Sequence, residues 1–258
     1  MIYLSTQRRA LCVFAVAFLG AVSLRAQTST LSSAPAIAMR DEGHHHLVFE
    51  NSYVHIFFVE IPAHETTLFH HHDLPYISVP PGGSDTNPSA LGGSGAASAP
   101  IFARVGYAAG NFSHAVTNSG DATLRNVAIE LVRPQGTVRN RCSGVLHDQP
   151  REICNLPDLT ATNPSRHAPL FETDEILVES WEVEPATTTA ALNDGVDMLI
   201  AGLTDVRITG ISGVDSANAL RGGELWIPAG SKPVFKTAPD RGGHLIAITF
   251  KDSAPVPH

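Results

Sequence analysis

Short apolar runs separated by turn residues dominate the chain from residue 46 to residue 251. The first run, Leu47 to Ile61, is dense in valine, isoleucine, phenylalanine and tyrosine, and it ends at Pro62. A second run spans Thr67 to Val79, and a third spans Val127 to Leu131. β-branched and aromatic residues are enriched in strands, and proline interrupts strands. The pattern therefore predicts β-strands joined by turns, with almost no helix.

The same pattern occurs twice. Leu170-Phe171-Glu172 resembles Val48-Phe49-Glu50, and the apolar run from Ile176 to Val183 repeats the one from Val54 to Ile61, at a spacing of 122 to 123 residues. Two homologous all-β halves are predicted, and short, evenly spaced strands favour a closed or double-sheet architecture such as the jelly roll. Two unrelated β domains of similar composition are the alternative.

The first 26 residues have the pattern of an export signal. Arg8 and Arg9 precede an uncharged apolar run from Ala10 to Leu24, which is short for a membrane span and long enough for the core of a signal peptide. We expect cleavage after Ala26 and an exported protein, periplasmic or secreted, with no membrane segment after the signal is removed. A retained membrane anchor is the alternative.

The remaining chain divides by composition. Residues 27 to 45 are rich in serine, threonine and alanine and are predicted to be a mobile arm, with ordered structure starting near His46. The first β half is assigned to residues 46 to 133 and the second to residues 167 to 252. Residues 80 to 100 form a stretch of proline, glycine, serine and alanine that is unusually long for a loop, so it is either a functional lid or a disordered insertion.

Two cysteines remain once the signal, with Cys12, is removed. Cys142 and Cys154 lie 12 positions apart in a polar segment, residues 134 to 166, that is predicted to link the two halves. Because an exported protein meets an oxidising compartment, we expect a disulfide between them. A metal site that also uses His147 is the weaker alternative, since two thiols and one imidazole are an incomplete structural zinc set.

The charge of the chain excludes one class of partner. Its 17 basic and 25 acidic residues give a net charge of −8, and only three of the basic residues are lysines. The sequence has no basic stripe that could neutralise phosphates, so nucleic acid is excluded as a partner. It also lacks a phosphate-binding glycine loop, a Gly-x-Ser-x-Gly elbow and a His-Glu-x-x-His motif, which argues against nucleotide and hydrolase chemistry.

The placement of histidines is the strongest chemical signal. His70, His71 and His72 lie inside the second apolar run, where alternation puts His70 and His72 on one face and His71 on the other. Two neighbouring imidazoles on an inward face have little reason to be buried unless an ion coordinates their nitrogens. His114, at the start of another predicted strand, could supply a third nitrogen. We therefore predict one bound divalent metal ion; surface histidines without a metal are the alternative.

Other polar residues are weaker candidates. His44 to His46, at the edge of the arm, are expected to be exposed, and His55 and His64 are expected to be satisfied surface or core residues. Tyr76 lies on the same run as two of the predicted ligands and is a candidate catalytic residue, as a proton donor or ligand contact. Tyr107 could play a similar part or simply pack.

These residues together resemble the cupin superfamily. Ile61-Pro62-Ala63, then His70-x-His72, then Pro75-Tyr76 is similar to the first cupin motif, a Pro-Gly turn followed by His-x-His and then a glutamate. Gly110 to Asn118 is similar to the second motif, a glycine followed by a histidine and, four residues later, an asparagine. The resemblance implies a bicupin, two tandem jelly-roll β-barrels in one chain. It puts His70, His72 and His114 at the positions of the metal ligands.

The sequence departs from the cupin pattern in two places. The glutamate ligand of the family falls at or near Tyr76, which leaves three histidines, a set found in zinc sites and in three-His iron members of the superfamily. In the second half, Asn193, Gly195 and Pro233 stand at the positions of the three ligands. The second barrel is therefore expected to be a structural partner without a metal site.

The function implied by this resemblance is metal chemistry on a small molecule. A three-His site leaves coordination positions open, which suits a metal-dependent oxygenase or isomerase acting on a small organic molecule. A non-catalytic module that binds a small ligand, or a purely structural one, is the alternative. Three imidazoles do not discriminate among iron, manganese, zinc, nickel, cobalt and copper. Both a monomer and a homodimer are compatible with the sequence.

Overall fold

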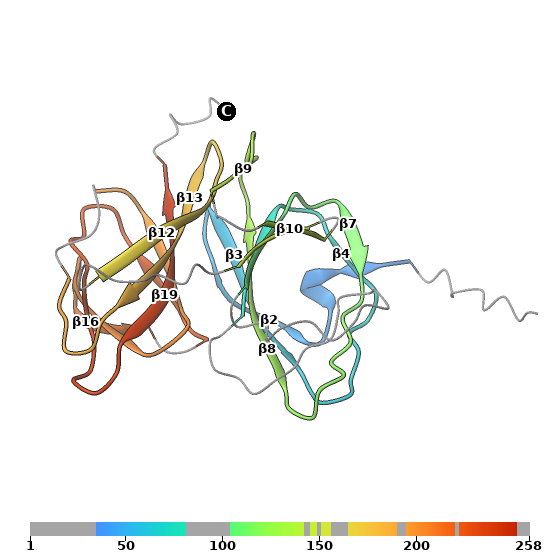
Figure 1. Ribbon diagram of the computed structural model, residues 1–258. Coiled ribbons are helices and arrows are strands. Elements are labelled where there is room, and N and C mark those ends of the chain that lie inside the picture. Colours follow the sequence, from blue (N-terminus) through green and yellow to red (C-terminus); the bar gives the residue numbers. More distant parts are fainter. Residues whose placement is uncertain are drawn as a thin grey trace, which may run out of the picture. The chain divides into compact units, whose positions relative to one another are not determined.

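The computed structural model describes residues 35–80, 104–141, 145–148, 151–155, 165–189, 195–219 and 222–251. Within these ranges the chain forms β-strands and one short 3-10 helix, η1 (Met39–Asp41), so the prediction of an all-β protein is confirmed (Figure 1). None of the described helical residues forms a span long and apolar enough to cross a membrane. The predicted signal and the stretch from residue 81 to residue 103 lie outside the described residues.

The first half of the chain forms a large and a small sheet. The large sheet has the strand order β10-β11-β6-β5-β8-β3-β2. Its strands are β2 (His45–Glu50), β3 (Val54–Ile61), β5 (Tyr76–Val79), β6 (Arg104–Ala108), β8 (Leu124–Leu131), β10 (Val145–Asp148) and β11 (Arg151–Asn155). The small sheet has the order β1-β4-β7 and consists of β1 (Ile37–Ala38), β4 (His70–His72) and β7 (Phe112–His114).

The second half also consists of a large and a small sheet. Its large sheet has the order β17-β14-β19-β13-β12-β9 and contains β9 (Arg139–Asn140), β12 (Ser165–Glu172), β13 (Ile176–Val183), β14 (Met198–Gly202), β17 (Glu224–Ile227) and β19 (Gly243–Phe250). Its small sheet has the order β16-β15-β18 and contains β15 (Val206–Ile211), β16 (Val214–Ala219) and β18 (Val234–Lys236). Each half is therefore a double-sheet β structure.

The internal repeat extends to individual hydrogen bonds. The backbone N–H of Val116 donates to the hydroxyl oxygen of Thr67 at 2.9 Å, and the N–H of Phe235 donates to that of Thr189 at 3.0 Å. Each threonine N–H in turn donates to the carbonyl of the same partner, at 2.9 and 3.0 Å. Corresponding segments of the two halves are thus joined by a threonine side chain in the same way.

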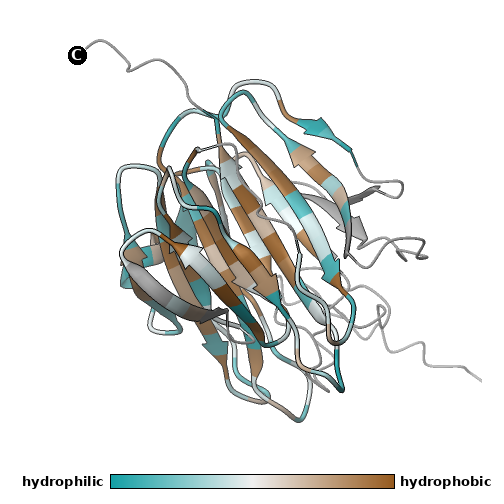
Figure 2. Ribbon diagram, turned by 90° about the vertical axis from the view of Figure 1, so that its left-hand side faces the viewer, coloured by the Kyte–Doolittle hydropathy of each residue, from teal (hydrophilic) through white to brown (hydrophobic). Residues whose placement is uncertain are grey.

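The large sheet of the first half buries both of its faces. On one face Val54 and Ile56 of β3 belong to a core that also contains Val178 of the second half. On the other face Phe57 of β3 belongs to a core that also contains Met39 of η1. Apolar side chains accordingly lie on both faces of β3. Figure 2 shows brown apolar positions along the strands, with white and teal positions between them. This two-sided burial explains why the sequence there is a continuous apolar run.

The N-terminal segment is more ordered than its composition predicts. Residues 27 to 45 were expected to be a mobile arm, but β1 pairs in parallel with β4, in the register Ile37 to His70, and η1 buries Met39. Ordered structure therefore begins before His46. A serine- and alanine-rich composition gives no sign of this, because the order comes from pairing with a strand more than 30 residues away in the sequence.

The segment from residue 134 to residue 166 is also not a simple linker. Strands β10 and β11 form a hairpin that continues the large sheet of the first half beyond β6, and β9 pairs with β12 of the second half. Cys154 lies in β11, opposite Val145. Cys142 lies outside the described residues, so the disulfide between the two cysteines stays a prediction.

Candidate metal centre

Strand register brings the three predicted ligands together. In the antiparallel pair of β4 and β7, His70 is directly opposite His114, and His72 follows two positions later on the same face of β4. One ring nitrogen from each of these three histidines lies within 4.8 Å of the other two. The structure thus places His70, His72 and His114 in one cluster that contains no carboxylate among the described residues.

Two residues of the second motif hold β7 in place. Gly110 has a φ of +81°, and a Cβ atom there would lie 2.5 Å from the carbonyl carbon of Leu74, so only glycine fits this close approach. The buried amide of Asn118 donates to the carbonyl oxygens of Ile61 at 2.9 Å and Ala122 at 2.8 Å. Gly110 and Asn118 therefore fix the chain on either side of His114.

The donor set of the cluster fits a metal ion. The Nδ1 of His70 lies 2.8 Å from the carbonyl oxygen of Leu68, which makes Nδ1 the protonated nitrogen and leaves the lone pair on Nε2. That Nε2 and the Nδ1 of His72 are buried and have no hydrogen-bond partner in the protein. The Nε2 atoms of His72 and His114 lie 3.0 Å apart. Two nitrogens that each lie about 2.1 Å from one ion stand about 3 Å apart when they bind at a right angle.

The electrostatics of the cluster favour neutral imidazoles. Burial, and after it the neighbouring His114, lower the pKa of His72 to about 2. Burial also lowers the pKa of His70. Because a histidine binds a metal through an unprotonated nitrogen, these rings are ready to coordinate at neutral pH.

The middle histidine of the run faces away from the cluster. The Nδ1 of His71 lies 2.8 Å from the hydroxyl oxygen of Ser113, and its Nε2 lies 3.3 Å from the carboxylate of Asp73. This is the placement expected from strand alternation. His71 is therefore a neighbour in sequence that is not part of the site.

The two tyrosines singled out in the sequence have different surroundings. Tyr76 is buried beside the cluster, with its ring stacked on that of His72 at a centroid distance of 4.5 Å. Tyr107 is buried in the core between the large sheets, where its ring lies 6.1 Å from that of Phe171. Tyr76 thus contacts the cluster, and Tyr107 lies in the core. Tyr76 stands at or near the position where the cupin pattern has its glutamate. A catalytic role for Tyr76 stays a prediction.

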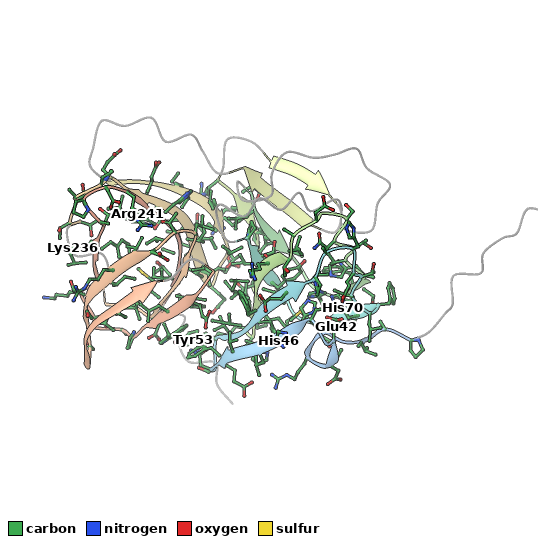
Figure 3. All side chains as sticks on the ribbon, turned by 90° about the horizontal axis from the view of Figure 1, so that it is seen from below. Glu42, His46, Tyr53, His70, Lys236 and Arg241 are labelled. Atoms are coloured by element: carbon green, nitrogen blue, oxygen red, sulfur yellow. The ribbon has the colours of Figure 1, made fainter. Side chains whose placement is uncertain are left out.

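Two residues of the N-terminal segment belong to the same neighbourhood, and the sequence analysis missed both. His45 is buried at the start of β2, and its ring lies 4.7 Å from that of His70 and 6.5 Å from that of His72. Its Nδ1 lies 2.5 Å from a carboxylate oxygen of Glu42, which is also buried. Figure 3 shows Glu42 and His70 close together, in the part of the first half where His46 also lies.

The prediction that His44 to His46 are exposed is therefore wrong for His45. His46 is exposed, while His44 is partly buried and bonded through Nδ1 to Glu42 at 3.0 Å. β2 begins at His45, so His45 and His46 lie on opposite faces of a strand, but the sequence does not show which of them faces inward. An acidic residue three positions before His45 was the available signal.

The carboxylate of Glu42 is held by several donors. The backbone N–H groups of His44 and Leu68 donate to it at 3.0 and 3.1 Å. Burial alone would raise the pKa of Glu42, but the hydrogen bonds from His44, His45 and Leu68 lower it to about 2. Burial lowers the pKa of His45 to about 4, against the opposing effect of Glu42. At neutral pH the pair is thus a carboxylate that accepts a hydrogen bond from a neutral imidazole.

The corresponding region of the second half is apolar. A buried cluster that contains Phe235 of β18 and Val183 of β13 joins its two sheets. Gly195 and Pro233, at two of the predicted ligand positions, have no side chain that can bind a metal, and Asn193 lies outside the described residues. A partly buried histidine of this half, His244, is bonded through Nε2 to the hydroxyl of Ser180 at 2.8 Å.

Comparison with known proteins identifies the fold. No protein family model matches the sequence, and no curated protein matches it either. Among solved structures, a cupin 2 conserved barrel domain protein from Leptotrichia buccalis superposes with a TM-score of 0.51 at 8% identity, over 80% of this chain and 87% of that chain. A putative glyoxylate-induced protein from Pseudomonas aeruginosa superposes with a TM-score of 0.55 at 11% identity, over 82% and 80%.

A third structure is that of an enzyme. Salicylate 1,2-dioxygenase from Pseudoaminobacter salicylatoxidans, in complex with gentisate, superposes with a TM-score of 0.53 at 10% identity, over 77% of this chain and 69% of that chain. At such low identity these matches establish the fold. The chain therefore has the cupin fold, as its two motifs predicted, and it combines this fold with a cluster of three histidines that fits a metal ion.

Proposed function

We propose that the protein binds one divalent metal ion through His70, His72 and His114 and acts as a metal-dependent oxygenase on a small organic molecule. The observation that carries this proposal is the buried Nε2 of His70, which has no hydrogen-bond partner in the protein and belongs to a cluster with one ring nitrogen each of His72 and His114. A buried nitrogen without a partner costs on the order of 1 to 3 kcal/mol. Coordination of an ion by His70 Nε2 would remove the cost of leaving this nitrogen without a partner.

An ion held in this way would supply a Lewis acid and, if redox-active, a centre for electron transfer. The residues of the chain then have separate tasks. The rings of His70, His72 and His114 would provide the lone pairs. The stacking of Tyr76 on His72 fixes the orientation of that ring.

Apolar side chains make the surroundings of the cluster dry. Met39, Phe57 and Tyr76 are at most 4% exposed and belong to one buried core, against which Phe112 of β7 packs. The ring of Phe112 also stacks on that of His72 at 5.0 Å. Exclusion of water strengthens electrostatic interactions with a bound substrate and protects reactive species from side reactions.

The comparisons support an oxygenase over other metal chemistry. A salicylate dioxygenase shares the fold, and its structure contains the small aromatic acid gentisate. The three-imidazole donor set suits iron as well as zinc. An isomerase or a non-catalytic binding module would use the same three histidines. The identity of the bound metal and the consumption of oxygen therefore distinguish an oxygenase from these two alternatives.

Metal analysis of the purified protein, prepared without a histidine tag or chelator, tests the first part of the proposal. We expect about one equivalent of metal in the wild type and none in the variant with His70→Ala, His72→Ala and His114→Ala. His71→Ala is the matched control, because His71 is on the same strand and faces Ser113, and it should keep its metal. A triple variant with full metal content would refute the site.

Oxygen uptake by the iron-loaded protein tests the second part. The assay would use a panel of small aromatic acids and enolisable acids, with the metal-free triple variant as the blank. Uptake that depends on both the metal and one substrate class supports the oxygenase. One tightly bound zinc ion with no oxygen uptake would instead favour an isomerase or a binding module.

We further propose that the protein is exported, periplasmic or secreted, and loses its first 26 residues. Support comes from the sequence alone, namely the basic start and the apolar run from Ala10 to Leu24. Mass spectrometry of the protein recovered from the periplasm or medium of an expressing bacterium tests the proposal. An intact N-terminus in that material would contradict it.

A further inference from the structure

We propose that His45, oriented by Glu42, is a fourth nitrogen ligand of the metal ion, so that the centre has four imidazoles. This inference rests on the proposed three-histidine site and adds a residue from a different part of the chain. The three residues of the cluster come from β4 and β7 of the small sheet, whereas His45 begins β2 of the large sheet. The centre would then join the two sheets of the first half.

The distances place His45 beside the cluster, on the side of His70. The centroid of the His45 ring lies 4.7 Å from that of His70, the same distance that separates His70 from His114. The distance to His72 is 6.5 Å, against 5.1 Å between His70 and His72. His45 thus adjoins one side of the group of three histidines whose ring nitrogens lie within 4.8 Å of one another, and coordination would require its ring to move closer to that group.

Hydrogen bonds set His45 and His70 in the same tautomer. Each has its Nδ1 next to an acceptor, the carboxylate of Glu42 for His45 at 2.5 Å and the carbonyl of Leu68 for His70 at 2.8 Å. With Nδ1 protonated, the lone pair of each ring is on Nε2. Metal-binding histidines commonly donate their other ring N–H to a carboxylate or a backbone carbonyl, and this contact makes the ring a better ligand.

Glu42 is anchored in a way that suits this task. Its side chain is fully buried, and one of its donors, the N–H of Leu68, belongs to the segment that leads into β4. The same carboxylate therefore binds both the segment that precedes β4 and the ring of His45. A buried carboxylate needs such partners to remain charged, and a charged carboxylate orients the imidazole most firmly.

The strand itself supplies a matched contrast. His45 faces inward and is buried, while His46, the next residue along β2, is exposed. The two differ in face and not in local sequence or element. If His45 binds the ion because it faces inward, replacing His45 should weaken metal binding and replacing His46 should not.

NMR of the imidazole nitrogens in isotope-labelled protein tests the proposal directly. Spectra are recorded for the metal-free protein and after one equivalent of Zn²⁺, with His45→Gln and His46→Gln used to assign the two signals. We expect four Nε2 resonances to move to the position of coordinated nitrogen, and the His45 signal to be one of them. The number of coordinated nitrogens in the wild-type spectrum does not depend on whether any variant folds.

Zn²⁺ affinity, measured by competition with a chelator, is the second readout. Loss of the carboxylate partner in Glu42→Gln should weaken binding by roughly 10- to 100-fold. His45→Gln should weaken it at least as much, and His46→Gln should leave it unchanged. Circular dichroism of the metal-free variants confirms that each is folded before its affinity is compared.

The outcomes separate this inference from the proposed function. If the wild type binds one Zn²⁺ and only His70, His72 and His114 show coordinated nitrogens, the fourth ligand is refuted and the three-histidine site stands. Weaker binding by His45→Gln without a coordinated His45 signal in the wild type also refutes it. If the wild type binds no Zn²⁺, the proposed function fails, and this inference fails with it.

Discussion

Replacing Glu42 by glutamine should destabilise the protein in a pH-dependent way. Hydrogen bonds lower the pKa of Glu42 from 4.5 to about 2 in the folded protein. Each pKa unit corresponds to about 1.4 kcal/mol of differential stability, so the ionised carboxylate contributes about 3 kcal/mol. Because the folded-state pKa is the lower one, this contribution is present above about pH 4.5 and is lost as the pH falls toward 2.

Urea unfolding of the metal-free protein across this pH range is the assay. We expect Glu42→Gln to lower the free energy of unfolding by about 3 kcal/mol at neutral pH, with the deficit shrinking as the pH falls below about 4.5. Glu50→Gln is the control, because Glu50 forms an exposed pair with Arg40 and should cost less than about 1 kcal/mol. A deficit for Glu42→Gln that is the same at acid and neutral pH would refute the reasoning.

Three further predictions concern the supports of the site and the cysteines. Asn118→Ala should lower the free energy of unfolding by about 2 to 4 kcal/mol, measured in urea, since buried carbonyls lose their donor. Gly110→Ala should lower both the melting temperature and the Zn²⁺ content, because of its positive φ and its close approach to a neighbouring backbone, whereas Gly43→Ala, with open space around it, should change neither. A thiol count on denatured, unreduced protein from the periplasm should find Cys142 and Cys154 both blocked; two free thiols would exclude the disulfide.

The strands were predictable because their signals are local. The run from Leu47 to Ile61 and the break at Pro62 correspond to β2 and β3, and Thr67 to Val79 contains β4 and β5. Side chains in a strand alternate by geometry, so His70 and His72 could be assigned to one face without knowledge of the partner strands. His114 was assigned through the resemblance of Gly110 to Asn118 to the second cupin motif, in which a histidine at this position is a metal ligand.

The N-terminal segment was not predictable in this way. Its composition resembles that of a disordered arm, and neither the burial of Met39 nor the pairing of Ile37 with His70 leaves a periodic trace in so short a stretch. The hairpin of β10 and β11 was missed for a related reason. A polar segment becomes a strand when an edge of an existing sheet is available to pair with it, and the sequence does not show that edge.

The sequence by itself therefore determined the all-β class, the internal repeat, and the placement of His70 and His72 on one face of a strand, because these follow from patterns that can be read along the chain. Only the tertiary structure decided that Glu42 and His45 lie beside this cluster, and that the ring of His71 is turned to Ser113. Contacts of this kind join residues from separate strands, and they depend on register and long-range packing, which no local pattern specifies.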